Sequence, residues 1–167
     1  ILQVVANDSL LPQPTGQYNV ISDADMALGT EDGIDNGGAW HNTRAAGQLI
    51  ENGGTGNDVI VNQSSFYHTT FGDSGDDDLS GNATNEIMVG GLGNDKVTGY
   101  DGRDILYGGH GDDHVQGGND DDKLSGGAGN DKLFGGYGDD YSEGGAGNDF
   151  FWDFTGNNSL RGGAGDD

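Results

Sequence analysis

Acidic side chains recur every nine residues along the second half of the chain, and side chains of this type at this spacing could bind divalent cations. The series comprises Asp77, Glu86, Asp95, Asp104, Asp113, Asp122, Asp131, Asp140, Asp149, Asn158 and Asp167, of which Asn158 alone is neutral. Carboxylates and backbone carbonyls are the ligands that calcium prefers. The series therefore favours repeated calcium sites, whereas choosing two of its members as a general acid and base would be arbitrary.

Large apolar residues follow the acidic series two positions later and indicate the strands that would position it. Leu106, Leu124 and Leu133 are examples, each at position eight of a nonapeptide whose position six is acidic. The repeats start at Gly72 and run without a slip to Asp167, as ten complete nonapeptides and six residues of an eleventh. A three-residue segment with an apolar middle residue predicts a short strand whose middle side chain points inward.

The first six residues of each repeat are predicted to form a turn. Two copies read GGAGNDKLF (126–134) and GGAGNDFFW (144–152), with three glycines before the aspartate. Glycine permits positive φ angles and a close approach of two backbones, which such turns require. The glycines assigned to turns on this basis are Gly72, Gly90, Gly93, Gly108, Gly111, Gly126, Gly129, Gly144, Gly147 and Gly162.

Strand, turn, strand and turn within eighteen residues predict an all-β fold, a flattened parallel solenoid with two sheets of short strands. Turns eighteen residues apart would stack at the strand spacing of about 4.8 Å. Two aspartates at that separation repel by roughly 3 kcal/mol at an effective dielectric constant of about 20. A ladder of carboxylates is therefore unstable alone, and we expect calcium ions between the turns.

The nonapeptides GGLGNDKVT (90–98), GGHGDDHVQ (108–116), GGAGNDKLF and GGAGNDFFW resemble the GGxGxDxUx repeat of RTX (repeat-in-toxin) proteins, in which U is a large apolar residue. The resemblance covers at least residues 72–167. It implies a right-handed parallel β-roll with calcium bound between stacked turns. It also implies export by the type I secretion machinery, an extracellular or cell-surface location, and folding only outside the cell.

Alternate repeats should fall on opposite edges of the solenoid, and the two edges differ in how many good calcium ligands they offer. The first edge carries Asp77, Asp95, Asp113, Asp131, Asp149 and Asp167, and its five gaps predict up to five strong calcium sites. The second edge carries Glu86, Asp104, Asp122, Asp140 and Asn158. Aspartate lies on both sides of its two central gaps only, which predicts two good sites, and weaker or empty sites at the ends beside Glu86 and Asn158.

Three regions are expected along the chain. Residues 1–52 are irregular and β-rich, either a cap on the solenoid or the end of a preceding domain. Residues 53–71 hold an isolated repeat, GGTGNDVIV (53–61) with Asp58 as a calcium ligand, followed by an insertion over 62–71. Residues 72–167 are the array, which stops within a repeat.

The charge and composition exclude several partners. Acidic residues number 29 against six basic ones, for a net charge of −23, and this balance argues against nucleic acid. There is no cysteine for a disulfide or a thiolate site, and no apolar run long enough for a membrane span. Apolar residues make up 31% of the chain, a poor supply for a core, so calcium is expected to decide whether the array folds.

Several outward strand positions are unexpectedly apolar. One sheet would present Ile87, Val89, Ile105 and Tyr107, and the other Phe134, Phe150 and Trp152. Other parts of the same protein could cover these side chains, or they could form a docking surface for self-association or for a neighbouring domain.

No catalytic motif is recognised, and His41, His68, His110 and His114 are scattered, so we expect no enzyme activity from this chain. Three functions stay open. The chain could be a structural module of an adhesin, surface-layer protein, extracellular fibre or toxin. It could be the secretion and folding appendage of an exported protease, lipase or alginate-modifying enzyme. It could also bind carbohydrate through its exposed aromatic residues.

Overall fold

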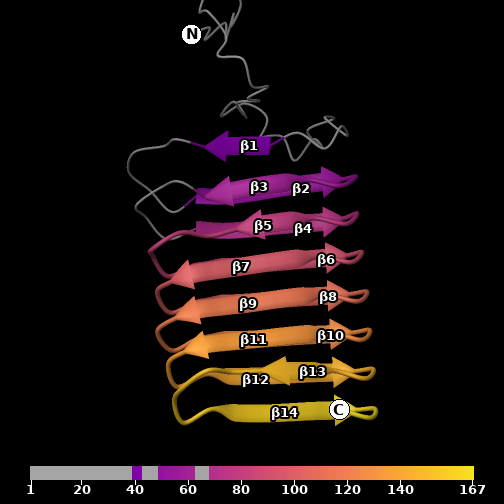
Figure 1. The fold of residues 1–167 in the computed structure, drawn as a ribbon. Helices are drawn as coiled ribbons and strands as arrows, with labels where there is room; N and C mark the ends of the chain where they lie inside the picture. Colours follow the sequence, from indigo (N-terminus) through magenta and orange to yellow (C-terminus); the bar gives the residue numbers. More distant parts are fainter. Residues whose placement is uncertain (1–38, 43–48, 63–67) are drawn as a thin grey trace, which may run out of the picture.

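The protein is described by a computed structural model that covers residues 39–42, 49–62 and 68–167. Its strands alternate between two seven-stranded parallel sheets, stacked coil upon coil (Figure 1). The first sheet contains β1 (Ala39–Asn42), β3 (Val59–Asn62), β5 (Asp78–Ser80), β7 (Lys96–Asp101), β9 (His114–Asn119), β11 (Lys132–Tyr137) and β13 (Phe150–Trp152). The second contains β2 (Leu49–Thr55), β4 (His68–Ser74), β6 (Ile87–Leu92), β8 (Ile105–His110), β10 (Lys123–Ala128), β12 (Tyr141–Ala146) and β14 (Ser159–Ala164).

The strand register confirms the predicted parallel β-solenoid. Lys123 of β10 pairs with Ile105 of β8 on one side and with Tyr141 of β12 on the other, so neighbouring coils are offset by eighteen residues. Two nonapeptides therefore make one coil, one strand in each sheet. Among the described residues there is no helix that could cross a membrane.

The strands are longer than the predicted three residues and the turns correspondingly shorter. Strands β6 to β12 each span six residues, because they continue through positions one to three of the next repeat. The glycines of that segment take part in the ladder, as when Gly109 pairs with Gly91 and Gly127. Only positions four to six remain as the turn, for example residues 93–95 between β6 and β7. The six-residue turn expected from glycine content was therefore wrong, because glycine does not prevent parallel pairing, whether its counterpart is glycine or a residue such as Tyr100, which pairs with Gly118.

Close backbone stacking explains why the turns need glycine at position four. Gly93 has a φ angle of 130°, and a Cβ placed on it would collide with the carbonyl oxygen of Gly75 in the preceding coil. Asp120 occupies the same position with a φ angle of 74°, a conformation that an aspartate adopts only at some cost. The predicted positive φ is confirmed for the assigned glycines at position four, Gly93, Gly111, Gly129 and Gly147. It is wrong for those at position one, which lie within strands and have no positive φ: Gly72, Gly90, Gly108, Gly126, Gly144 and Gly162.

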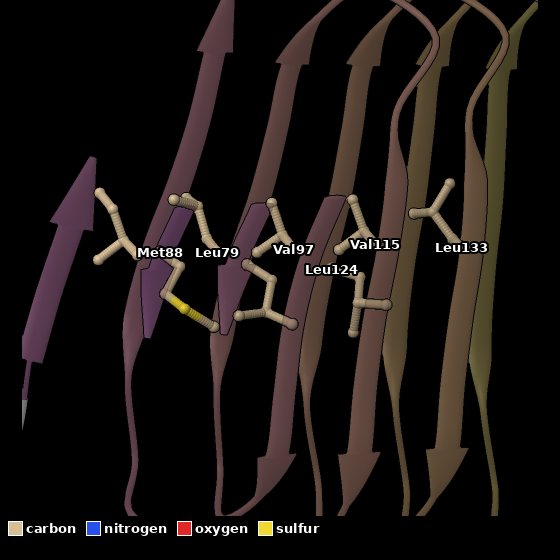
Figure 2. Close-up of a cluster of buried hydrophobic side chains, with 8 residues drawn as sticks. Leu79, Met88, Val97, Val115, Leu124 and Leu133 are labelled. Atoms are coloured by element: carbon tan, nitrogen blue, oxygen red, sulfur yellow. The ribbon is translucent and has the colours of Figure 1, made fainter. Parts of the chain in front are cut away.

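The core is a single narrow column between the sheets, built from position eight of each repeat. Figure 2 shows Leu79, Met88, Val97, Val115, Leu124 and Leu133 lying between the two sheets. Leu106 and Ile60 belong to the same buried cluster, and Phe151 packs against it. A repeat contributes at most one apolar side chain, and Ser142 holds the inward position of repeat 135–143, so the apolar burial per residue is small.

The isolated upstream repeat belongs to the stack. Strand β3 pairs with β5, and β4 lies between β2 and β6. Residues 68–71, the end of the segment that the sequence indicates as an insertion, form the first half of β4 and place Thr70 opposite Met88 at a buried inward position. In the predicted cap, residues 39–42 and 49–52 belong to the terminal strands β1 and β2, and the rest lies outside the described residues.

The single-file core makes each inward side chain expensive to remove. Leu124 is fully buried, and Leu124→Ala should lower the free energy of unfolding in saturating calcium by about 2–5 kcal/mol. Leu160→Ala is the matched control, because Leu160 has the same position in its repeat but is 52% exposed. Urea denaturation followed by circular dichroism would measure both, and equal shifts in the two variants would contradict the packing described.

Candidate metal centre

The position-six carboxylates lie in the turns and form two columns, one along each edge of the solenoid. The turns of the first edge lead from the second sheet to the first, as from β6 to β7 at Asp95. The turns of the second edge lead from the first sheet to the second, as from β7 to β8 at Asp104. The structure thus brings the predicted ligands of each edge together, and Asp58 joins the first column, since its backbone N–H donates to Asp77 Oδ1 at 2.8 Å.

A backbone hydrogen bond ties each carboxylate to the coil before it. The N–H of Asp95 donates to Asp113 Oδ1 at 2.8 Å, and the N–H of Asp113 donates to Asp131 Oδ1 at 2.9 Å. The same bond recurs along the second edge, where the N–H of Asp104 donates to Asp122 Oδ1 at 2.8 Å. One oxygen of each stacked carboxylate is therefore occupied and its rotamer is set.

The second oxygen of eight stacked aspartates is buried and has no hydrogen-bond partner. This holds for the Oδ2 atoms of Asp77, Asp95, Asp104, Asp113, Asp122, Asp131, Asp140 and Asp149. The side chains that carry them are almost completely buried, for example 2% exposed at Asp113. A buried ionised oxygen without a donor is strongly unfavourable unless a cation or a proton accompanies it.

The space beside each unpartnered oxygen is lined by further oxygen atoms. A Cβ placed on Gly90 would collide with Asp95 Oδ2 and would lie 2.6 Å from the carbonyl oxygen of Gly108 in the next coil. The glycine at position one thus leaves open a small cradle of carboxylate and carbonyl oxygens. In the described part of the chain no three Asp, Glu or His side chains converge on one point, so the cradle combines side-chain and backbone donors. Such a set suits calcium, which accepts mixed oxygen ligands in a flexible shell.

Burial raises the pKa of five carboxyl groups in the middle of the two columns well above the usual range for aspartate. The pKa of Asp104 is raised to about 8, that of Asp113 and of Asp122 to about 7, and that of Asp95 and of Asp131 to about 6. Loss of hydration is the largest cause, neighbouring carboxylates add to it, and the backbone N–H bond opposes it. The apo columns therefore hold protons near neutral pH or bear an unbalanced charge.

The two ends of the second edge differ from its centre. The carboxylate of Glu86 accepts hydrogen bonds from Thr84 Oγ1, from Asn82 N at 3.4 Å and from Asn62 Nδ2 at 3.5 Å. Protein donors thus take up both of its oxygens. At the other end the amide oxygen of Asn158 accepts the ladder bond from Asp140 N at 2.9 Å.

Basic side chains pair with exposed acids instead of the buried columns. Lys96 Nζ lies 3.0 Å from Asp78 Oδ2 on the outside of neighbouring strands. Arg161 lies 3.4 Å from Glu143, and Arg103, a turn residue, lies 3.1 Å from Asp121 at position five. None of these pairs brings a cation to a position-six carboxylate, so the unpartnered oxygens there remain for a metal.

A second ladder, which the sequence analysis missed, runs along the outer side of the turns. At position five the N–H of Asn94 donates to Asp76 Oδ1 at 2.8 Å, and the N–H of Asp112 donates to Asn94 Oδ1 at 2.8 Å. These bonds point back to the preceding coil, whereas the position-six bonds point forward. The recurrence of Asn or Asp at position five was the available signal, and it marks residues that tie the turns together without closing the cradle.

A parallel β-solenoid whose two edges present stacked carboxylates and carbonyls is a cation-binding repeat module. A family model, described as the RTX calcium-binding nonapeptide repeat, matches four copies at residues 71–97, 80–115, 116–151 and 155–167, more than half of the chain. The chain belongs to this family, and it is a calcium-binding structural module. Searches of curated proteins and of solved structures found no match.

The raised pKa values predict that the free energy of unfolding of the calcium-free chain decreases as the pH rises. Aspartate in the unfolded chain ionises at its ordinary pKa of 3.8, and the folded groups ionise near 6 to 8, so between these values the folded state binds more protons. The free energy of unfolding should therefore fall as the pH rises through that window. Calcium-free protein should show more β structure by circular dichroism at about pH 5.5 than at about pH 8.

Saturating calcium should flatten this profile, because the ion balances the charge that protons balance in its absence. A calcium-free chain that is most ordered at about pH 8 would contradict the burial of unpartnered carboxylates.

Proposed function

We propose that this chain is the calcium-dependent structural part of an exported protein and that it folds when it meets extracellular calcium. The observation that carries the proposal is the column of buried, unpartnered carboxylate oxygens on each edge, such as those of Asp113 and Asp122. Calcium would supply the positive charge that these oxygens lack, held by the carboxylates and by position-one carbonyls. The chain's own contribution is to align the oxygens and to exclude water from them.

The energetic argument favours a switch between two calcium levels. The core offers one inward side chain per repeat, and the stacked carboxylates repel one another. Extracellular calcium modules bind with dissociation constants of about 10⁻⁴ to 10⁻³ M. At about 1 mM calcium, a site of about 10⁻⁴ M adds roughly 1.4 kcal/mol to the free energy of unfolding, and several such sites add a whole domain's stability. At cytosolic calcium this contribution is absent.

The ion positions follow from the columns. We assign up to five ions to the first edge, in the gaps between Asp77 and Asp167, and two or more to the second. The central gaps of the second edge, on either side of Asp122, have aspartate in both coils. The Glu86 end is the weakest position, because protein donors already bind that carboxylate.

Export by type I secretion and a place outside the cell or on its surface belong to the same proposal, and the family membership supports them. We assign no catalytic role to the array. His114, for example, stacks against Phe134 with ring centroids 4.7 Å apart, and burial lowers its pKa. A flanking enzyme, for which the array would serve as secretion and folding appendage, is the alternative context, and the full-length reading frame would distinguish the two.

Calcium should convert the chain from disordered to β-structured. We expect Asp113→Asn to raise the calcium concentration at the midpoint of this transition several-fold and to remove bound calcium, because the change replaces an unpartnered Oδ2 with an amide and keeps the Oδ1 acceptor. Circular dichroism during calcium titration, with ion counting by mass spectrometry, would measure both effects.

Asp112→Asn is the matched control. It removes the same charge one residue away, but Asp112 is exposed and its Oδ1 accepts the outer ladder bond from Asn130, which an amide oxygen can also accept. Its midpoint should stay close to that of the unaltered chain. A full β spectrum in calcium-free buffer at neutral pH would overturn the folding proposal.

An aromatic row on the first sheet favours a second role, association with another copy of this chain. The ring centroids of Phe134 and Phe150 lie 6.2 Å apart, and those of Phe150 and Trp152 lie 6.4 Å apart. Phe150 and Trp152 are 49% and 53% exposed. On the second sheet Ile87 and Tyr107 are exposed and Val89 and Ile105 half-buried, so the apolar surface there is smaller. An exposed aromatic row of this kind is typical of a contact surface. Binding of carbohydrate by the same rings is the competing use.

Replacement of the aromatic row should abolish association. We expect the double variant Phe150→Ser and Trp152→Ser to sediment as a monomer in calcium, under conditions in which the unaltered chain self-associates. Gln116→Ser, at an exposed position on β9, two strands away from β13, should not change the sedimentation. Unchanged assembly of the double variant would remove the proposal, and loss of binding on a glycan array would instead support the carbohydrate use.

A further inference from the structure

The repeat at residues 153–161 departs from the nonapeptide pattern at Asp153, Phe154 and Asn158, and two of these departures concern a carboxylate. This repeat begins with Asp153, whereas all the remaining repeats from Gly72 to Gly162 begin with glycine. The same repeat carries Asn158, the neutral member of the acidic series at position six. Counted along the sequence, the repeat has lost a carboxylate at one position and acquired one at another.

The side chain of Asp153 is held by the backbone and points into the second edge. Its Oδ1 accepts hydrogen bonds from Gly136 N at 3.0 Å and from Phe154 N at 2.9 Å. Its Oδ2 is buried and has no hydrogen-bond partner. The bonds to Oδ1 therefore fix the side chain in an orientation that leaves a charged oxygen facing the interior.

Two unpartnered oxygens converge beside Gly135. A Cβ placed on Gly135 would lie 2.6 Å from Asp140 Oδ2 and 2.6 Å from Asp153 Oδ2. Asp140 is only 2% exposed and its Oδ2 has no partner. In the preceding gap, a Cβ on Gly117 would collide with Asp122 Oδ2 and lie 2.7 Å from the carbonyl oxygen of Gly135. At the last gap a carboxylate thus takes the place of a carbonyl.

We propose that Asp140 and Asp153 hold a calcium ion in this last gap of the second edge, with Asp153 supplying the carboxylate that Asn158 lacks. The gap has the same count of two carboxylates as the gap between Asp122 and Asp140. Asn158 keeps the other function of position six, because its amide oxygen accepts the ladder bond from Asp140 N. The inference rests on the proposed calcium function and reverses the expectation of a weak site at this end.

The opposite end of the same edge also departs from the repeat pattern, but position one of its repeat is glycine and supplies no additional carboxylate. There Glu86 replaces aspartate, and hydrogen bonds from Thr84, Asn82 and Asn62 take up its oxygens. Asp153 Oδ2 and Asp140 Oδ2 have no such donors. Of the two side chains that distinguish these ends, Glu86 and Asp153, Asp153 alone keeps an oxygen without a hydrogen-bond donor.

Ion counting on the full chain tests the inference. Asp153→Asn retains the Oδ1 acceptor and should bind one calcium ion fewer per chain than the unaltered protein, measured by elemental analysis after equilibrium dialysis. Asp153→Gly restores the residue found at position one elsewhere and should show the same loss. An unchanged count in Asp153→Asn would overturn the inference.

A rescue variant separates loss of the site from loss of structure. The double variant Asp153→Gly with Asn158→Asp returns both positions to the repeat pattern and should regain the lost ion. A double variant that stays one ion short would overturn the view that Asp153 substitutes for the position-six carboxylate. If the unaltered chain binds no calcium, the proposed function itself fails, which is a different outcome from an unchanged count.

Terbium luminescence gives a readout that is local to the site. Trp152 directly precedes Asp153, and Trp40 is the only other tryptophan of the chain. In a Trp40→Phe background, terbium emission excited through Trp152 should fall in Asp153→Asn and return in the rescue variant. Asp77→Asn, at the far end of the stack, is the control and should lose an ion without reducing this emission. Emission that is insensitive to Asp153 would contradict a site there.

Discussion

Repulsion between carboxylates stacked one coil apart is the constraint on which the rest of the structure depends. The fold makes equivalent residues of successive coils neighbours, so one aspartate per turn becomes a column of negative charge. The backbone N–H of each aspartate neutralises part of this by binding Oδ1 of the next, as between Asp95 and Asp113. Oδ2 stays unpartnered, and this remaining charge is the reason why we propose a fold that depends on a cation.

The glycines and the thin core follow from the same constraint. A Cβ at position one, as at Gly90, would occupy the space beside the free oxygen, so the cation cradle and a side chain exclude each other. Positions one, two and four are taken by turn and cradle requirements in most repeats, which leaves position eight to build the core. In the function proposed above, a bound ion offsets the charge repulsion that a core of one column leaves.

Periodicity predicted which residues are equivalent, and from this the coil length, the inward column and the two carboxylate columns followed. It did not predict which backbone and side-chain groups of these equivalent residues form hydrogen bonds with each other. The strands extend through the glycines because equivalent positions of successive coils pair with each other, as Gly91 pairs with Gly109. The outer ladder at Asp76 and Asn94 depends on the direction in which a side chain turns, and the repeat pattern carries no information on direction.

A departure from the repeat pattern can have one consequence when judged from the sequence and another in the folded stack. Position by position, Asn158 is a lost ligand and Asp153 a lost glycine, so the two substitutions add up to a weakened coil. In the stack, position one of one coil and position six of the coil before it face the same space, because the coils are parallel and in register. A carboxylate at position one, such as Asp153, can therefore line the same gap as the position-six carboxylate of the coil before it. The negative charge that a cation must balance is therefore counted for each gap between coils, and residues of two repeats contribute to that charge.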